Sequence, residues 1–196
     1  PNNAVWDVDL FIAGGQPAAP TGIGQQGDVF ELETPGTQTV GYSPTGIGTA
    51  TIDIVTLSSV ITIASFISPV SGLPSSSGGV EQIVYQGLGG NDPLIMNGTA
   101  GSDTATINAD GTGTFRSTLS PAFDYSGVGV VIVNGGLGTD RVVYNATIDN
   151  DVIDSQQTSA TLVSTTVNSL THTANNTEII GINTLSGDDV IRIGVI

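Results

Sequence analysis

The stretch Gly87-Leu88-Gly89-Gly90-Asn91-Asp92-Pro93-Leu94-Ile95 is matched further along the chain by Gly135-Gly136-Leu137-Gly138-Thr139-Asp140-Arg141-Val142-Val143, at a spacing of 48 in residue number. Each copy opens with a glycine-rich turn, reaches an aspartate and continues into a strand-like segment. The same spacing separates Asp103 from Asp151, and Asn97 from Asn145. Because turn residues match turn residues at three correlated spacings, the sequence predicts an internal repeat and a stacked architecture.

The repeat occupies the chain from residue 80 onward. Its first copy contains three β-branched or aliphatic runs, its second copy contains equivalent runs, and its third reaches a turn at Asp188 and Asp189. The predicted strands are 80–85, 94–96 and 104–107 in the first copy, 128–133, 141–144 and 152–153 in the second, and 178–182 and 191–196 in the third.

A parallel β-helix or related β-solenoid fits this pattern. The 27 glycines and the abundant Thr, Ser, Asn, Val and Ile favour turns and strands, and no helical periodicity is present. Since one coil of a solenoid typically takes roughly 20–25 residues, the 48-residue unit is expected to cover two coils. A β-sandwich is the alternative, because strands separated by glycine turns describe sandwiches too, although a sandwich does not require the repeat.

The chain divides into residues 1–79 and residues 80–196. The first part contains strand-like runs at 5–12, 27–32, 50–57 and 60–67, and a Ser/Gly/Pro-rich loop at 68–79, but it does not show the repeat clearly. We expect it to be a cap, or a strand donated to a neighbouring subunit. Residues 191–196 read as a strand with no polar cap, which would leave a sticky sheet edge. This ending predicts self-association or neighbouring domains of a longer chain.

Composition excludes several classes of partner and of chemistry. Eighteen acidic residues stand against Arg116, Arg141 and Arg192, with no lysine, for a net charge of −15. Such a chain is repelled by nucleic acid and by anionic membrane surfaces. No apolar run approaches the ~20 residues of a membrane span. There is no cysteine, and the one histidine, His172, lies between two threonines. We interpret it as a solvent-facing strand residue and expect no catalysis.

The turn at 135–143 fits the nine-residue pattern G-G-x-G-x-D-x-U-x. Here the chain resembles the haemolysin-type (RTX) repeats of large secreted bacterial proteins. That resemblance implies calcium as a cofactor, bound by turn aspartates and by the carbonyls of Gly89 and Gly138. The implied ligands are Asp92, Asp103, Asp140, Asp151, Asp188 and Asp189. The chain departs from the family, because its turns are isolated rather than in tandem, and Leu88 stands where a second glycine is required. The alternative is that each aspartate caps its own turn.

Three Asn-x-Thr triplets, at Asn97, Asn145 and Asn175, match the N-glycosylation motif. The first two recur with the repeat, so repetition explains them without a glycan.

These features together favour a non-catalytic extracellular or cell-surface scaffold, such as a segment of a fibre, a surface layer or an adhesin, rigidified by calcium. The alternatives are a carbohydrate-binding or carbohydrate-cleaving β-helix, and a calcium-triggered folding module that assists export.

Overall fold

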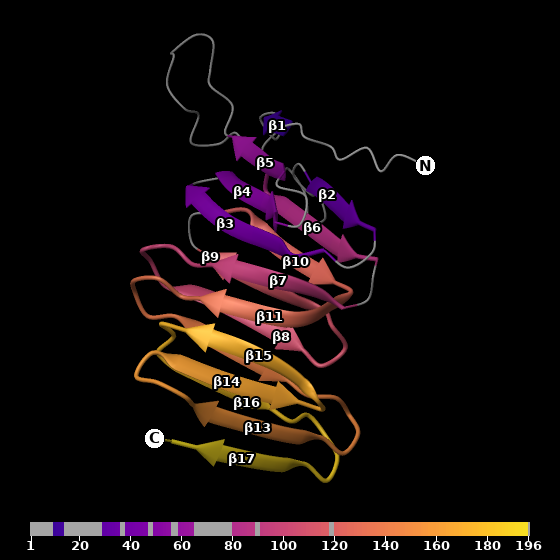
Figure 1. Ribbon diagram of the computed structural model, residues 1–196, viewed down its shortest axis with the longest axis vertical. Helices are drawn as coiled ribbons and strands as arrows, with labels where there is room; N and C mark the ends of the chain where they lie inside the picture. The colour runs from indigo at the N-terminus through magenta and orange to yellow at the C-terminus, as the bar shows by residue number, and fades with distance from the viewer. Residues whose placement is uncertain are drawn as a thin grey trace, which may run out of the picture.

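The computed structural model describes residues 10–13, 29–35, 38–46, 49–55, 59–64, 80–88, 91–117 and 120–195. Within these residues the regular structure consists of strands arranged in two sheets (Figure 1). The strands are β1 (Leu10–Ala13), β2 (Val29–Thr34), β3 (Val40–Gly46), β4 (Thr49–Ile54), β5 (Ser59–Ala64), β6 (Gln82–Gly87), β7 (Asp92–Asn97), β8 (Asp103–Asn108), β9 (Gly113–Ser117), β10 (Ala122–Ser126), β11 (Val128–Asn134), β12 (Arg141–Asn145), β13 (Val152–Gln157), β14 (Leu162–Val167), β15 (Leu170–Asn175), β16 (Ile179–Asn183) and β17 (Val190–Gly194).

The ten-stranded sheet has the order β1-β5-β4-β3-β7-β11-β15-β14-β13-β17, and the seven-stranded sheet has the order β16-β12-β8-β9-β10-β6-β2. Strands that are distant in sequence pair in parallel, such as β7 with β11 and β8 with β12. Antiparallel pairs occur only within three meanders among the described strands: β3-β4-β5, β8-β9-β10 and β13-β14-β15. Both sheets are therefore mixed.

The strands recur in one order, and we call each recurrence a five-strand unit. Its first strand lies in one sheet and its second strand in the other. The remaining three strands form a meander in the same sheet as the first. Strands β6 to β10 form one such unit with the meander in the seven-stranded sheet. Strands β11 to β15 form the next, with the meander in the ten-stranded sheet. Strands β1 to β5 have the same order, and β16 and β17 begin it again. Successive units thus exchange the two sheets.

This exchange explains the spacing of the sequence repeat. Asp92 begins β7 in the ten-stranded sheet, whereas Asp140 directly precedes β12 in the seven-stranded sheet. Residues that stack on one another within a sheet do not follow this spacing: Thr104 beside Arg141 and Arg141 beside Ile179 are 37 and 38 positions apart, and Ile132 beside Thr173 is 41. The sequence period therefore marks the five-strand unit, and not the distance between stacked neighbours.

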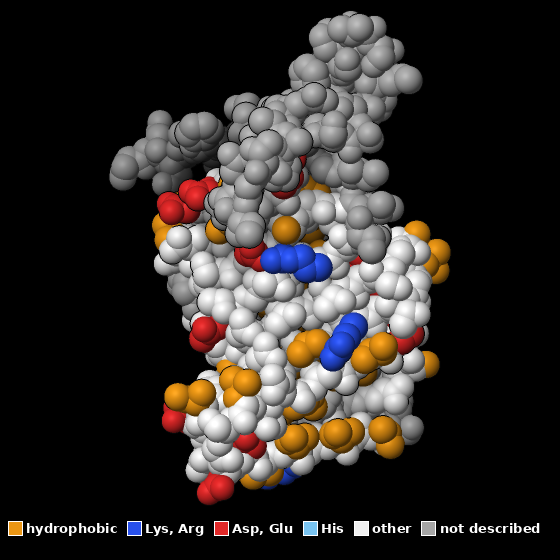
Figure 2. Space-filling model, turned by 180° about the vertical axis from the view of Figure 1, so that it is seen from behind, with side chains coloured by type: hydrophobic (Ala, Val, Ile, Leu, Met, Phe, Trp, Pro, Cys, Tyr) orange, Lys and Arg blue, Asp and Glu red, His pale blue; other side chains and the backbone are white. Residues whose placement is uncertain are grey.

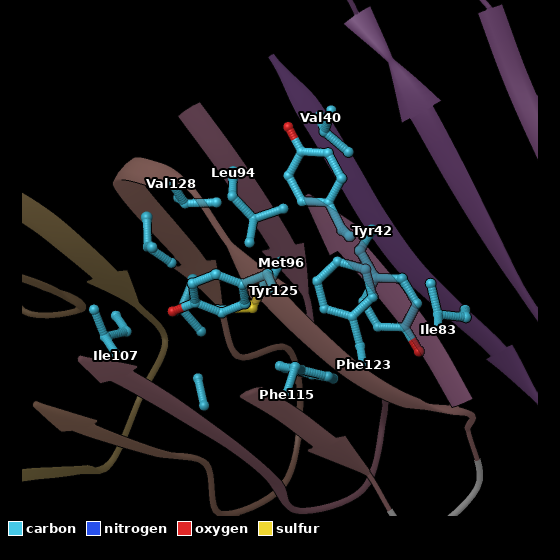
Figure 3. Close-up of a cluster of buried hydrophobic side chains, with 14 of the residues drawn as sticks. Val40, Tyr42, Ile83, Leu94, Met96, Ile107, Phe115, Phe123, Tyr125 and Val128 are labelled. Carbon is cyan, nitrogen blue, oxygen red and sulfur yellow. The ribbon is translucent and has the colours of Figure 1, made fainter. Parts of the chain in front are cut away.

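The core lies between the sheets, and Figure 3 shows the part of it where side chains of the meander β8-β9-β10 meet those of β3 and β7. The rings of Tyr42 and Phe123 stack with centroids 4.2 Å apart, and Phe115 meets Tyr42 edge-on at 5.8 Å. Aromatic pairs in these geometries add about 0.5–1.5 kcal/mol to the stabilisation from burial. Alternate residues of each strand enter this layer, as the burial of Leu94 and Met96 shows.

The prediction of an all-β fold is confirmed. The purely parallel sheets of a parallel β-helix are not observed, because β4, β9 and β14 run antiparallel to their neighbours. The repeat unit also holds five strands rather than two plain coils. The predicted loop at 68–79 lies outside the described residues, and the prediction that residues 1–79 form a cap or a donated strand stays a prediction. Among the described residues, no helix is long and apolar enough to cross a membrane.

Candidate functional site

The aspartates predicted from the repeat lie at the crossings between the sheets. Each of five six-residue segments leaves a strand of one sheet and ends in an aspartate at the start of a strand in the other. The segments are 87–92, 98–103, 135–140, 146–151 and 184–189, ending in Asp92, Asp103, Asp140, Asp151 and Asp189. The first four aspartates are at most 3% exposed. Asp189 is partly buried, whereas Asp188 is exposed. Asp189 rather than Asp188 is therefore the equivalent of the other four turn aspartates. It lies one position later than the 48-residue spacing from Asp140 predicts.

Asp103 and Asp151 close their own turns through a threonine four residues earlier. The Thr99 backbone N–H donates to Asp103 Oδ2 at 2.6 Å, and the Thr99 hydroxyl donates to the same oxygen at 3.0 Å. Thr147 repeats both contacts with Asp151 Oδ2, each at 2.9 Å. Burial opposes the charge of Asp151, but hydrogen bonds from Asn168 and Thr147 outweigh it and lower the pKa of the carboxyl.

Other carboxylates link each turn to the next turn of the stack, by accepting the backbone N–H of the turn aspartate. The Asp103 N–H donates to Asp140 Oδ1 at 2.8 Å, and the Asp140 N–H donates to Glu178 Oε2 at 2.7 Å. On the other sheet, the Asp151 N–H donates to Asp189 Oδ1 at 2.9 Å. Charge-assisted bonds of this kind are roughly twice as strong as neutral ones. The aspartates therefore fix both the turn and the stacking of neighbouring turns.

Asp140 differs from Asp103 and Asp151 because Gly136 stands at the position of the capping threonine. Its Oδ2 is buried without a hydrogen-bond partner, and it lies 2.6 Å from the position that a Cβ on Gly135 would take. The oxygen is therefore packed against the Gly135 Cα. Burial raises the pKa of the Asp140 carboxyl. The hydrogen bond from the Asp103 N–H acts in the opposite direction, but the negative charges of Asp103 and Glu178 raise the pKa further.

Asp92 is held by residues of the first unit of the chain together with Tyr85 of its own unit. Its Oδ2 accepts hydrogen bonds from the Thr34 hydroxyl at 3.1 Å and the Tyr85 hydroxyl at 3.0 Å, and its Oδ1 accepts the Gln38 N–H at 2.9 Å. Burial raises the pKa of the Tyr85 hydroxyl above its ordinary value, so the hydroxyl remains a donor. The sequence repeat predicted Asp92 but not the partners from the first unit, which lie up to 58 positions away.

These contacts bear on the calcium implied by the turn pattern. Calcium takes roughly 6–8 oxygen ligands. No group of three or more acidic or histidine side chains is placed to hold a metal ion within the described ranges. Asp92, Asp103 and Asp151 direct their carboxylates at protein donors, and space near Asp140 Oδ2 is taken by the backbone of its own turn. Gly138 has φ of 119° and abuts Gly101, and Gly89 lies outside the described residues. Asp103 and Asp151 thus cap their own turns, and calcium binding at these turns stays a prediction.

The asparagines of the Asn-x-Thr triplets lie in ladders at the ends of the strands. Asn97 accepts a hydrogen bond from the Asn134 amide at 2.8 Å and donates its own amide to Ser43. The Asn145 amide donates to Asn108 at 2.8 Å. A glycan on Asn97 or Asn145 would replace one of these amide hydrogens. Asn175 is partly buried, and its carbonyl accepts the Gly135 N–H at 2.8 Å.

His172 is 3% exposed, so its interpretation as a solvent-facing residue is wrong. It lies in β15, where its side chain enters the layer between the sheets while the flanking threonines face outward. Its Nδ1 accepts the Val131 N–H at 3.1 Å, and its ring centroid lies 5.9 Å from that of Tyr144. Burial lowers the pKa of His172 to about 4.

The burial of His172 predicts a loss of stability in acid. Because the folded-state pKa lies below the ordinary 6.5, the stabilisation is fully present above pH 6.5 and is lost as the pH falls toward 4. The full loss is about 3 kcal/mol. His172→Asn keeps an acceptor for Val131 without a titrating ring. Urea unfolding at pH 7 and pH 4.5 should show a smaller difference for this variant than for the wild type. Equal differences would contradict the assignment.

Comparisons with protein-family models, with curated proteins and with solved structures found no match for this chain. The resemblance to haemolysin-type repeats rests on the turn residues alone.

Proposed function

We propose that this chain is a non-catalytic structural segment of an extracellular or cell-surface protein, built as a solenoid-like stack of β coils. The observation that carries the proposal is the five-strand unit, which recurs along the chain while its turn aspartates bind neighbouring coils together. The function is then mechanical. Parallel strand pairing and the carboxylate contacts between turns resist separation of the coils.

Polar side chains at the ends of the strands support this role. The Asn134–Asn97 and Asn145–Asn108 amide pairs connect adjacent coils, as does the Asp103–Asp140 contact. Because these side chains are hydrogen-bonded within the stack, they stabilise the stacking and are not available to bind a ligand. Dense pairing of this kind also leaves few openings for a protease.

A carbohydrate-binding or carbohydrate-cleaving β-helix is the second candidate. It would be favoured by a cleft lined with aromatic rings and paired carboxylates. Tyr42, Tyr85, Tyr125 and Tyr144 are instead buried in the core. Arg116 forms an ion pair with Asp124 and donates to two backbone carbonyls, so it is engaged within the sheet. These positions favour the scaffold over a sugar platform.

The experiment that tests the scaffold combines circular dichroism with sedimentation velocity, first with excess EDTA and then with millimolar calcium. If the aspartates are turn caps, we expect the strand signal and the sedimentation coefficient to be the same in both. A strand signal that develops only with calcium would contradict this and support a calcium-triggered folding module.

The carbohydrate alternative needs its own measurement. We expect no binding to neutral or acidic polysaccharides in affinity electrophoresis, and no release of reducing ends on prolonged incubation. Retarded migration on one polysaccharide class, or release of sugars, would overturn the non-catalytic scaffold.

A further inference from the structure

An asparagine ladder crosses the ten-stranded sheet where its parallel strands end. Asn97 is the last residue of β7, Asn134 is the last residue of β11, and the two residues are paired. The Asn134 amide donates to Asn97 Oδ1 at 2.8 Å, and the Asn97 amide donates to the Ser43 hydroxyl at 2.8 Å. The ladder thus passes from coil to coil through two amides and ends on a hydroxyl.

Each of these asparagines is followed by a glycine, which the stacking requires. A Cβ on Gly98 would lie 1.7 Å from the Gly135 carbonyl oxygen, and a Cβ on Gly135 would lie 2.1 Å from the Asn176 carbonyl oxygen. The crossing turns therefore leave no space for a side chain at either position. This requirement places two Asn–Gly junctions, Asn97-Gly98 and Asn134-Gly135, at tightly packed points of the stack.

Asparagine is chemically labile because its side chain can react with its own backbone. Hydroxide removes the proton of the following N–H, and the nitrogen attacks the side-chain carbonyl carbon. A C–N bond closes a five-membered succinimide, the Cγ–Nδ2 bond breaks, and the nitrogen that leaves takes a proton from water to become ammonia. Water then opens either carbonyl of the ring, which yields aspartate or isoaspartate. The reaction is easiest before glycine, which has no Cβ to obstruct the approach of nitrogen to carbon.

In the folded chain, all three reacting groups of the first junction are hydrogen-bonded to other coils. The nucleophile is the Gly98 nitrogen, whose N–H donates to the Asn134 carbonyl oxygen at 2.6 Å. The side-chain oxygen of Asn97 accepts the Asn134 amide, and the leaving nitrogen of Asn97 donates to Ser43. Attack requires the nitrogen and the carbon to turn toward each other, and that movement breaks these bonds.

The second junction is held in the same way. The Gly135 N–H donates to the Asn175 carbonyl oxygen at 2.8 Å, and the Asn134 amide donates to Asn97. The nucleophile and the leaving group of this junction are therefore bonded to strands on either side of β11, which are β15 and β7.

Buried carboxylates beside both glycines oppose the reaction as well. Asp103 Oδ2 lies 2.9 Å from the position that a Cβ on Gly98 would take, and Asp140 Oδ2 lies 2.6 Å from the equivalent position at Gly135. Figure 2 shows several acidic side chains along the edges of the stack, where the chain crosses between the sheets. Since the attacking species is a nitrogen anion, these negative charges destabilise it.

The seven-stranded sheet has the same ladder without the reactive junctions. The Asn145 amide donates to Asn108 Oδ1 at 2.8 Å, and the Asn108 amide donates to the Thr112 hydroxyl at 2.9 Å. Alanine follows both asparagines, at Ala109 and Ala146. Because its Cβ obstructs the attack, these two asparagines are an internal control for the Asn–Gly junctions.

We propose that Asn97 and Asn134 are sites of spontaneous deamidation, and that the stacking of the coils prevents the reaction. Separation of two coils here frees the glycine N–H and the side-chain amide together, and water and hydroxide are the only other reactants. Isoaspartate adds a methylene group to the main chain, in a turn that has no space even for a Cβ. A coil that opens and forms isoaspartate therefore does not restack, so the modification makes unfolding irreversible. This inference concerns the chemistry of the fold and does not depend on the proposed scaffold.

Peptide mapping by mass spectrometry tests the proposal on the full chain, incubated at mildly alkaline pH either folded or in guanidinium chloride. In the denaturant, we expect Asn97 and Asn134 to deamidate while Asn108 and Asn145 remain intact over the same period. In the folded chain, all four are expected to remain intact. The rate at Asn97 should differ between the two states by a factor on the order of a hundred or more, because the reaction is limited to the rare open state.

Ser43→Ala tests the role of the ladder, because it removes the acceptor of the leaving amide and leaves the Asn–Gly junction unchanged. We expect deamidation of Asn97 in the folded chain to accelerate by about fivefold, the effect of losing one hydrogen bond. Thr112→Ala is the matched control, since it removes the equivalent hydroxyl of the other ladder. It is expected to leave the rate at Asn97 as in the wild type. Circular dichroism checks that both variants are folded at the start.

Protection of both junctions in the folded wild type, with an acceleration confined to Ser43→Ala, supports the proposal. Equal rates in the folded and the denatured chain would overturn it, because the stack would then give no protection. An unchanged rate at Asn97 in Ser43→Ala, or the same acceleration in Thr112→Ala, would also overturn the role of the ladder. The scaffold is tested separately, by the calcium and polysaccharide measurements.

Discussion

Gly98→Ala is expected to lower the free energy of unfolding by about 3 kcal/mol or more, a large part of the total stability of a single domain. A Cβ on Gly98 would lie 1.7 Å from the carbonyl oxygen of Gly135 and 2.9 Å from Asp103 Oδ2. The carbonyl belongs to the turn 135–140, which stacks on the turn 98–103 and whose N–H groups are bonded in their turn to Asn175 and Glu178. The Gly135 carbonyl cannot move without separating two stacked turns, and the Asp103 carboxylate cannot move without losing its hydrogen bonds to Thr99, so the added methyl group strains both.

Thermal and urea unfolding followed by circular dichroism measures this effect. At about 2–4 °C per kcal/mol for a chain of this size, the midpoint should fall by roughly 10 °C. Gly194→Ala is the control, because its Cβ would meet nothing closer than Gln156 Cγ at 3.4 Å. If both variants unfold at the same temperature, the turns are not packed against one another as described.

Asp92→Ala is expected to cost about 3 kcal/mol of stability, equally in EDTA and in calcium. The substitution removes the acceptor of three donors, the Thr34 hydroxyl, the Tyr85 hydroxyl and the Gln38 N–H. The two hydroxyls lie 2.9 Å apart, so one of them can still donate to the other. An unsatisfied buried donor costs about 1–3 kcal/mol, and the three are partly relieved by rearrangement. The measurement is urea unfolding of the variant and the wild type in both buffers.

Asp188→Ala serves as the comparison, because Asp188 is an exposed neighbour of the equivalent turn aspartate. It is expected to change stability by less than about 0.5 kcal/mol. A loss for Asp92→Ala that is present in calcium but absent in EDTA would contradict the turn-cap assignment. That result would show Asp92 acting through a bound ion.

The positions of the turn aspartates could be predicted from the sequence, because a glycine turn followed by an aspartate and alternating aliphatics is a local pattern. Their partners could not. Asp92 is satisfied by Thr34 and Gln38, which belong to a part of the chain where the repeat is not readable. The burial of His172 is hidden for a related reason. Its flanking threonines indicate a polar strand, but β15 lies inside a sheet, so one face of that strand is interior.

By itself, the sequence determined that this protein is built of strands, where most cross-sheet turns fall, and that one long unit recurs along the chain. These features follow from glycine, aspartate and β-branched residues acting over a few neighbours. Only the tertiary structure decided that each unit contains a meander and that successive units exchange sheets. The turns after β8 and β14 contain residues at positive φ, Gly111 and the pair Asn168 and Ser169, as hairpins require. Which sheet each meander joins depends instead on which edge is free when the chain returns. That choice is made by long-range pairing, which no local run of residues encodes.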